Sequence, residues 1–181
     1  ARYPHVRIRL LNYSAPQAVK ALENNIIDFA IVSTPVLVHK HMHQEKLVSY
    51  DEILLGGTKY KQFAQQVHYL EDISEMPLIG LCEGSSTHTH YSRFFIEHDL
   101  PFEPDMEAAM TDQVLPMITH NLGIGFYPKS LALEAIEKEL VFPIELTEPL
   151  PNRDVVVITN NHTPINSAAR RFLEFLLENR K

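Results

Sequence analysis

The sequence contains few of the residues that define specialised protein classes. Among its 181 residues there are one cysteine, Cys82, six glycines and twelve prolines. These numbers exclude collagen-like and low-complexity chains, and a single thiol excludes a disulfide scaffold. An unpaired cysteine is typical of a reducing compartment, so we expect a soluble, cytoplasmic protein.

Long hydrophobic runs and an excess of basic residues are also absent. A membrane helix needs about 18 apolar residues, and the densest apolar run, residues 26–32, contains Asp28. The 16 basic and 23 acidic residues give a net charge of −7, whereas a domain that grips duplex phosphates usually has a basic face. The first five residues do not resemble a signal peptide, and the chain begins with Ala1, which indicates a processed or excised chain.

The residues that are present favour an α/β protein. Hydrophobic residues make up 45% of the chain, enough for one sizeable core or two small lobes. The period of the apolar pattern switches repeatedly between two and 3.6 residues, so strands alternate with helices and parallel sheets are expected. The expected strands are residues 6–10, 26–32, 47–55, 77–82, 103–108, 123–127, 141–146 and 154–159; the expected helices are 14–25, 85–98, 112–120, 128–136 and 164–177.

The beginning of the chain reads as a β-α-β unit. Val6, Ile8 and Leu10 alternate with arginines, a helix opened by Ser14 follows, and residues 26–32 form the second strand. The short connections predict parallel strands and a right-handed crossover.

Two short segments rich in glycine or proline predict a division into lobes. Gly56-Gly57 and residues 149–151 (Pro-Leu-Pro) enclose a self-sufficient α/β stretch, and we interpret them as two crossings of a hinge. Lobe I would then comprise residues 1–56 and 150–181, and lobe II residues 57–149.

Several short motifs occur in a characteristic order along the whole chain. They are Tyr3-Pro4 before the first strand, the segment 21–31 (ALENNIIDFAI), the segment 84–87 (GSST), the segment 121–128 (NLGIGFYP) and the segment 167–172 (SAARRF). Together they resemble the effector-binding domain of LysR-type transcriptional regulators.

The resemblance implies a two-lobed fold of the type 2 periplasmic-binding-protein kind, with two crossovers and a small-molecule cleft between lobes. It also implies a homodimer or tetramer that binds DNA only through an N-terminal helix-turn-helix domain. Neither that domain nor the family's first strand is present in this sequence, and Asn25 stands where the family usually has glycine, which asparagine can replace.

The segment 84–87 is the strongest candidate for binding an effector. Free N–H groups at a helix start, surrounded by hydroxyls, suit an anion such as a carboxylate. We therefore expect Ser85, Ser86 and Thr87 to contact a small, anionic effector, with Thr89 as a secondary candidate. The alternative is that Ser85 or Ser86 only caps the helix.

Further candidates follow other predicted strands, because ligands of open α/β sheets bind beyond the carboxyl ends of strands. Ser33 and Thr34 follow residues 26–32, with an ordinary turn as the alternative. Thr111 opens the next helix, where Asp112 is expected to be the N-cap. Tyr127 borders the same region. Gly123 and Gly125 are expected to allow close backbone packing.

No metal site or catalytic constellation is predicted. His39, His41 and His43 alternate, but without a carboxylate or cysteine at ligand spacing we interpret them as a solvated loop or edge. His88 and His90 diverge on a helix, and Cys82, without a second thiol, reads as a core residue.

A nucleophile elbow, a Walker A motif, a zinc-protease motif and a dinucleotide motif are all missing, so neither an enzyme nor a cofactor is expected. The expected function is the effector-sensing part of a regulator. Two alternatives stay open: a solute-binding protein of a transporter, and an enzyme on the same fold with Asp112 as its acid.

Overall fold

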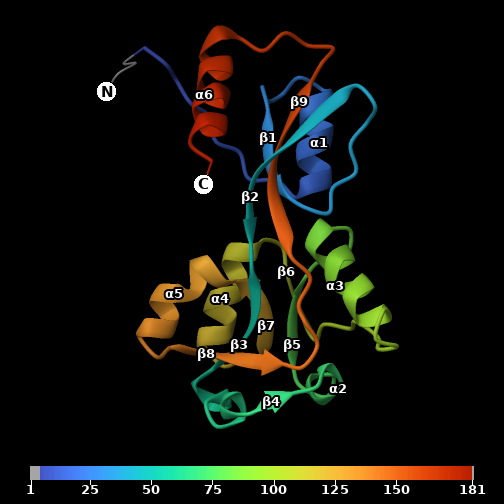
Figure 1. Ribbon diagram of the computed structural model, residues 1–181, viewed down its shortest axis with the longest axis vertical. Coiled ribbons are helices and arrows are strands. Elements are labelled where there is room, and N and C mark those ends of the chain that lie inside the picture. Colours follow the sequence, from blue (N-terminus) through green and yellow to red (C-terminus); the bar gives the residue numbers. More distant parts are fainter. Residues whose placement is uncertain (1–4, 181) are drawn as a thin grey trace. The chain divides into compact units, whose positions relative to one another are not determined.

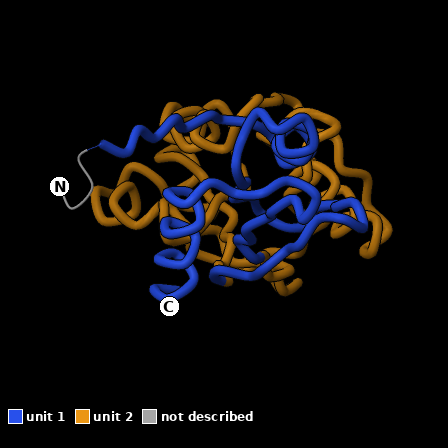
Figure 2. The backbone as a smooth tube through the Cα atoms, turned by 90° about the horizontal axis from the view of Figure 1, so that it is seen from above, with its two compact units in different colours: residues 1–48, 154–181 blue, residues 49–153 orange. Residues whose placement is uncertain are grey.

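The structure is a computed structural model that describes residues 5–180, so Tyr3-Pro4 lies outside the described residues. The chain divides into two compact units, which Figure 2 shows in different colours. Unit 1 is Ala1–Val48 with Asp154–Lys181, and unit 2 is Ser49–Arg153. The chain passes from one unit to the other within β2 (Met42–Tyr50) and within β9 (Arg153–Asn160).

These passages differ from the two crossings expected at Gly56-Gly57 and residues 149–151. Both glycines lie inside β3 (Glu52–Gly57) in unit 2. A Cβ on Gly56 would come within 2.6 Å of the Cβ of Tyr60, and one on Gly57 within 2.3 Å of the carbonyl oxygen of Ile118. The glycines therefore serve close packing within unit 2, a role that a turn-like dipeptide in the sequence does not reveal.

Unit 1 contains one small sheet with strand order β1-β9-β2. Strand β1 (Ala30–Ser33) runs antiparallel to β9, with Ala30 opposite Ile158. Helix α1 (Ala15–Glu23) packs its apolar side on this sheet. It begins where Gln17 Oε1 accepts from the Ser14 N–H (3.0 Å), and after it Asn25 adopts φ = 55°, as expected for a residue that can turn left-handed.

The predicted β-α-β unit is wrong. Residues 6–10 form no strand; Ile8 is 75% exposed and Leu10 93%. Alternating apolar residues form a strand only beside a hydrogen-bonding neighbour, and none of the described strands pairs with this segment. Strand β1 also begins only at Ala30, and its one partner, β9, is antiparallel, so no right-handed parallel crossover is formed.

Helix α6 (Ser167–Glu178) is the last helix along the chain and belongs to unit 1. It begins three residues later than the predicted 164–177 because the Asn166 Oδ1 accepts from the Ala169 N–H (2.9 Å) and so caps it. The helix is amphipathic, yet none of its residues is buried: Phe172 is 41% and Phe175 56% exposed.

Unit 2 is built on a mixed sheet with strand order β4-β8-β3-β7-β5-β6. Strand β5 is parallel to β6 and β7, and β4 is parallel to β8, whereas β3 is antiparallel to both β7 and β8. The expected parallel pairing is therefore found between β5 and its two neighbours and between β4 and β8, and the antiparallel strand β3 departs from it. The strands not yet bounded are β4 (Val67–His68), β5 (Leu78–Leu81), β6 (Met106–Ala108), β7 (Ile124–Pro128) and β8 (Val141–Leu146).

Helices cover both faces of this sheet (Figure 1). Helices α2 (Leu70–Ile73) and α3 (Ser86–Ile96) pack on one face, and α4 (Thr111–Thr119) and α5 (Lys129–Glu137) on the other. Leu54 and Leu55, adjacent in β3, are both fully buried because successive side chains of a strand point to opposite faces. Unit 2 thus has two hydrophobic cores.

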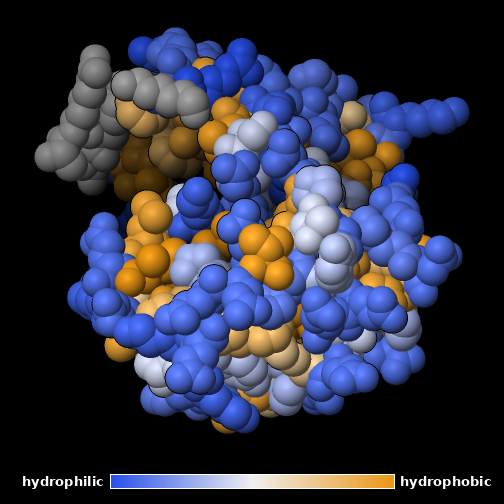
Figure 3. Space-filling view, turned by 60° about the horizontal axis from the view of Figure 1, so that its bottom comes forward, coloured by the Kyte–Doolittle hydropathy of each residue, from blue (hydrophilic) through white to orange (hydrophobic). Residues whose placement is uncertain are grey.

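Most predicted elements of unit 2 are confirmed, with shifted ends. The predicted strand 47–55 is two strands, β2 and β3, separated at Asp51, and His98 lies beyond the end of α3. Strand β4, helix α2 and two 3₁₀ turns, Thr58–Tyr60 and Phe63–Gln65, had no prediction because they are only two to four residues long. No helix among the described residues is long and apolar enough to span a membrane, and Figure 3 shows hydrophobic side chains as separate patches on a mainly hydrophilic face.

Candidate functional site

The candidate residues of unit 2 lie at one edge of its sheet. Strands β6, β5 and β7 are neighbouring parallel strands, so their carboxyl ends share an edge. Ser85–Thr87 follow β5, Thr111 follows β6, and Tyr127 is near the end of β7. This is the edge at which open α/β sheets bind ligands.

The start of α3 has the geometry of an open helix N-terminus. Gly84 precedes it with φ = +82°, a conformation that favours glycine, and an added Cβ would meet nothing within 4 Å. Ser85 is the N-cap: its Oγ accepts from the His88 N–H at 3.1 Å, and the residue is 8% exposed. Ser85 therefore caps the helix, and its expected contact with an effector stays a prediction. The N–H groups of Ser86 and Thr87, the first two helical residues, have no acceptor within the helix.

A buried polar network lies against Thr87. Arg153 Nη2 donates to Thr87 Oγ1 at 3.1 Å, and Arg153 Nη1 donates to Glu52 Oε1 at 3.0 Å. The other carboxylate oxygen of Glu52 accepts from the hydroxyl of Tyr91, which is on α3. Arg153, Glu52 and Tyr91 are 3%, 7% and 3% exposed. The network joins β9, β3 and α3 at the sheet edge that carries the candidate residues.

The burial of this region shifts the pKa values of two side chains, Tyr91 and His90. Burial, together with the neighbouring Glu52 carboxylate, raises the pKa of Tyr91 well above its usual value. Burial and the Arg153 charge lower the pKa of His90 to about 4, against a hydrogen bond to the backbone of Pro151 that raises it. His90 Nε2 has no hydrogen-bond partner among the described residues. His90 is therefore neutral and Tyr91 protonated at neutral pH.

In unit 1, Ser33 ends β1 and Thr34 follows it. The Asp154 N–H donates to Thr34 Oγ1 at 3.0 Å, and the Thr34 N–H donates to the Asp154 carbonyl at 2.9 Å. Thr34 is thereby fixed at the start of β9, at the carboxyl end of β1.

The remaining candidates of unit 2 have mixed outcomes. Thr111 is the first residue of α4, but Asp112 is not its N-cap: Met110 holds that position, and Gln113 Oε1 accepts from the Met110 N–H (3.0 Å). The long glutamine side chain reaches back and replaces the expected aspartate. Tyr127 is 6% exposed within the core beside α4 and α5, and burial, with Asp112 nearby, raises its pKa.

The two glycines of β7 and its approach permit close backbone contact, as predicted. A Cβ on Gly123 would lie 2.3 Å from the Pro77 carbonyl oxygen, and one on Gly125 3.1 Å from the Ile79 carbonyl oxygen.

Histidines gather in unit 1 without forming a metal cluster. The rings of His39 and His41 stack at 5.7 Å, and those of His41 and His162 at 4.7 Å, while His43 is paired with Glu45. Within residues 5–180, no group of three or more histidine, cysteine or acidic side chains is arranged to hold a metal ion. His162 had no signal in the sequence, since it lies far along the chain from the others.

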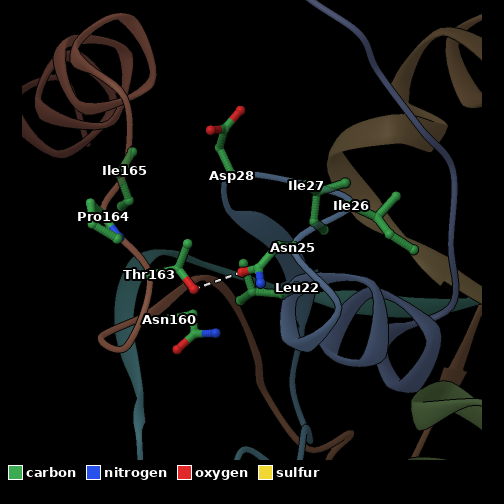
Figure 4. A pocket seen from close by; sticks show the side chains of 9 residues that line it. All are labelled: Leu22, Asn25, Ile26, Ile27, Asp28, Asn160, Thr163, Pro164 and Ile165. Carbon is green, nitrogen blue, oxygen red and sulfur yellow. Dashed lines mark hydrogen bonds between the residues drawn. The ribbon is translucent and has the colours of Figure 1, made fainter.

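Two hollows lie apart from the candidate residues. One in unit 1, of about 110 Å³, lies between the end of α1 and the loop before α6; Asn25 and Thr163 join across it by a 2.6 Å hydrogen bond (Figure 4). One in unit 2, of about 460 Å³, is lined partly by Glu52 and by apolar side chains of β3 and β8. No predicted site residue lines either hollow.

The sequence matches a known family along its whole length. Residues 1–181 match the LysR substrate binding domain, and the chain belongs to this family. Domains of the family have the two-lobed, periplasmic-binding-protein-like fold, so the predicted α/β class is confirmed.

Solved structures show the same fold. The chain is similar to the regulatory domain of CcmR from Synechocystis in complex with 2-PG, with a TM-score of 0.86 and 16% identity over 99% of this chain and 86% of that one. It is also similar to the effector-binding domain of QuiR in complex with shikimate, with a TM-score of 0.80 and 17% identity over 93% and 78% of the two chains.

Curated relatives are longer. An uncharacterized HTH-type transcriptional regulator of Bacillus subtilis, YoaU, is 21% identical over 97% of this chain and 58% of its own length. A probable RuBisCO transcriptional regulator of Chlorokybus atmophyticus is 23% identical over 94% of this chain and 56% of its own. The chain thus spans less than two thirds of the curated relatives it matches, and both are named as transcriptional regulators.

Proposed function

We propose that this effector-binding domain senses a small anionic molecule and thereby regulates transcription. The observation that carries the proposal is the start of α3, where the N–H groups of Ser86 and Thr87 lack an acceptor within the helix. These groups and the Thr87 hydroxyl lie at the sheet edge where open α/β sheets usually bind ligands. The partial positive charge of a helix N-terminus favours an anion there by about 0.3–1 kcal/mol when exposed and up to about 2 kcal/mol when partly buried. Charge-assisted hydrogen bonds add to this preference.

The ligand classes of two similar domains support a small molecule. CcmR and QuiR were solved with 2-PG and with shikimate, and shikimate is a carboxylate. Within unit 2, Thr111 and Tyr127 are proposed as further effector contacts. Within unit 1, Ser33 and Thr34 are proposed as effector contacts. Binding then shifts the population between two arrangements of the domain.

The regulatory role extends to the partners of the whole protein. We propose that the domain assembles as a homodimer or tetramer, in the cytoplasm, and that a helix-turn-helix domain elsewhere in the protein contacts DNA. The charge of −7 supports the absence of duplex binding by this chain itself. Catalysis is not part of the proposal, because the Ser85 and Thr87 oxygens are bonded to the His88 N–H and to Arg153, neither of which is a general base.

The test is a thermal-shift and titration screen with shikimate, inorganic phosphate, acetate and bromide. A ligand at 100 times its dissociation constant raises the free energy of unfolding by about 2.7 kcal/mol. The double variant Ser86→Ala/Thr87→Val should weaken the best of these ligands at least tenfold, or about 1.4 kcal/mol.

The matched control is Ser130→Ala/Thr119→Val, which removes the same two hydroxyl types from α5 and α4 and should leave affinity unchanged. An unchanged affinity in the first variant, with a lowered melting temperature, would show that the α3 residues only cap the helix.

A further inference from the structure

We propose that Arg153 is the positioning residue of the effector site: it holds the Thr87 oxygen as an acceptor and so turns the Thr87 hydroxyl proton toward the ligand. This inference rests on the proposed function and deepens it, because it assigns the direction of a donor in the site.

The direction follows from hydrogen-bond inventory. A guanidinium carries five N–H donors, has no acceptor and does not deprotonate in proteins. In the 3.1 Å contact between Arg153 Nη2 and Thr87 Oγ1, the threonine oxygen must therefore be the acceptor. One lone pair is then occupied, and the hydroxyl proton has to point away from the guanidinium.

The contact also changes the strength of the hydroxyl. A hydroxyl that accepts a bond from a cation is polarised, so it becomes a stronger donor and a poorer acceptor. Thr87 therefore suits a ligand oxygen that offers lone pairs, as in a carboxylate or phosphate. A ligand that places an N–H or O–H donor at this point is disfavoured.

Arg153 cannot easily leave Thr87. Its Nη1 is bound to Glu52 Oε1 at 3.0 Å, Glu52 is held in turn by the Tyr91 hydroxyl, and the guanidinium carbon lies 5.8 Å from the centroid of the Tyr50 ring. The side chains of Arg153 and Glu52 are each 3% exposed. A planar guanidinium with two such anchors keeps a fixed orientation, which a lysine in the same place would not.

The charges of Arg153 and Glu52 compensate each other, so the pair adds no net charge to the site. The preference for an anion then comes from oriented donors: the Thr87 hydroxyl and the N–H groups at the start of α3. This separates the role of Arg153 from that of an arginine that binds a ligand directly.

The test is a double-mutant cycle in which the affinity for inorganic phosphate, used as the probe, is measured for each variant. Glu52→Gln/Arg153→Met removes both buried charges together, which avoids an isolated buried ion, and leaves an acceptor for Tyr91. We expect about a tenfold loss of phosphate affinity in this variant and in Thr87→Val. The combination should lose about tenfold, not a hundredfold, because both changes remove the same oriented donor.

Two further variants sharpen the result. In a Thr87→Ser background, which keeps a hydroxyl, Glu52→Gln/Arg153→Met should again cost about tenfold. Arg93→Met/Glu97→Gln removes an exposed arginine–glutamate pair at the C-terminal end of α3 and should leave phosphate affinity unchanged.

Each outcome decides between the two proposals. If the wild type binds phosphate and the losses from Thr87→Val and Glu52→Gln/Arg153→Met multiply, Arg153 has only a structural role and the positioning assignment is overturned, while the anion site stands. The same holds if Glu52→Gln/Arg153→Met binds phosphate as the wild type does. If phosphate does not raise the melting temperature of the wild type, both the positioning role and the anion site at α3 are overturned.

Discussion

Unit 2 and unit 1 differ in how helices cover their sheets. In unit 2 helices bury both faces of a six-stranded sheet, and side chains such as Phe95, at 1% exposure, are sealed in its cores. In unit 1 one helix, α1, buries one face of a three-stranded sheet, and α6 has no buried residue. Among the described residues, unit 2 thus has two complete cores, and unit 1 has one core and an amphipathic helix with partly exposed phenylalanines.

This difference predicts where stability resides. Free energy from apolar burial scales with the area removed from water, so unit 2 should hold most of the cooperative core of the domain. The candidate anion site and its buried network belong to this better-packed unit, which favours a rigid site. Three experiments test this difference between the units.

The largest expected effect separates the two units by matched phenylalanine truncations. Phe95→Ala in unit 2 should lower the free energy of unfolding by about 3–5 kcal/mol, because it opens a cavity in a sealed core. Phe175→Ala in α6, where the ring is 56% exposed, should lower it by less than about 1 kcal/mol. Urea unfolding measures both, and equal losses would mean that α6 is as well packed as the cores of unit 2.

The next effect is a pH dependence from His90. Its pKa is lowered to about 4 in the folded chain, so the unfolded chain binds more protons below pH 6.5. The free energy of unfolding therefore falls as pH drops from 6.5 toward 4, by up to about 3 kcal/mol from this group, and is flat below.

The variant His90→Gln removes this titration. As the pH falls from 6.5 toward 4, its free energy of unfolding should therefore rise relative to that of the wild type. Urea unfolding at several pH values checks this. His43→Gln, at an exposed site on β2, is the control and should follow the wild type. Parallel pH profiles for the wild type and His90→Gln would contradict a buried neutral His90.

The smallest effect concerns the cap of α3. Ser85→Ala removes the acceptor of the His88 N–H and should lower the free energy of unfolding by about 1 kcal/mol. Hydrogen exchange at the His88 amide should accelerate in this variant. No change in exchange would show that the serine side chain does not stabilise the helix start.

Much of unit 2 could be predicted from its sequence, because continuous apolar runs bounded by turns specify buried strands. Strand β8 was predicted at both ends, and α3, predicted as 85–98, begins at Ser86 within the 84–87 segment. Residues 6–10 misled the prediction, since alternation records only the preference of a segment and not the presence of a partner strand. Unit 1 was therefore predicted less well than unit 2.

The candidate site shows the same limit. The hydroxyls of residues 85–87 could be identified because a glycine turn before a helix is a local signal. Glu52 and Arg153 could not, since they lie 101 positions apart and each looks in the sequence like a charged residue at a strand end. A buried ion pair is a property of the tertiary fold, and no local pattern announces it.

Two candidate threonines are anchored by two consecutive residues, Arg153 and Asp154. An insertion or deletion between these residues would therefore disturb the candidate site. Thr87 is held by the side chain of Arg153, and Thr34 by the main chain of Asp154. One codon inserted between them would move one anchor by about 3.3 Å and turn every following side chain of β9 to the other face of its sheet. Surface loops elsewhere can accept such insertions. At the junction of Arg153 and Asp154, however, a change in chain length would be as damaging as a change of either residue.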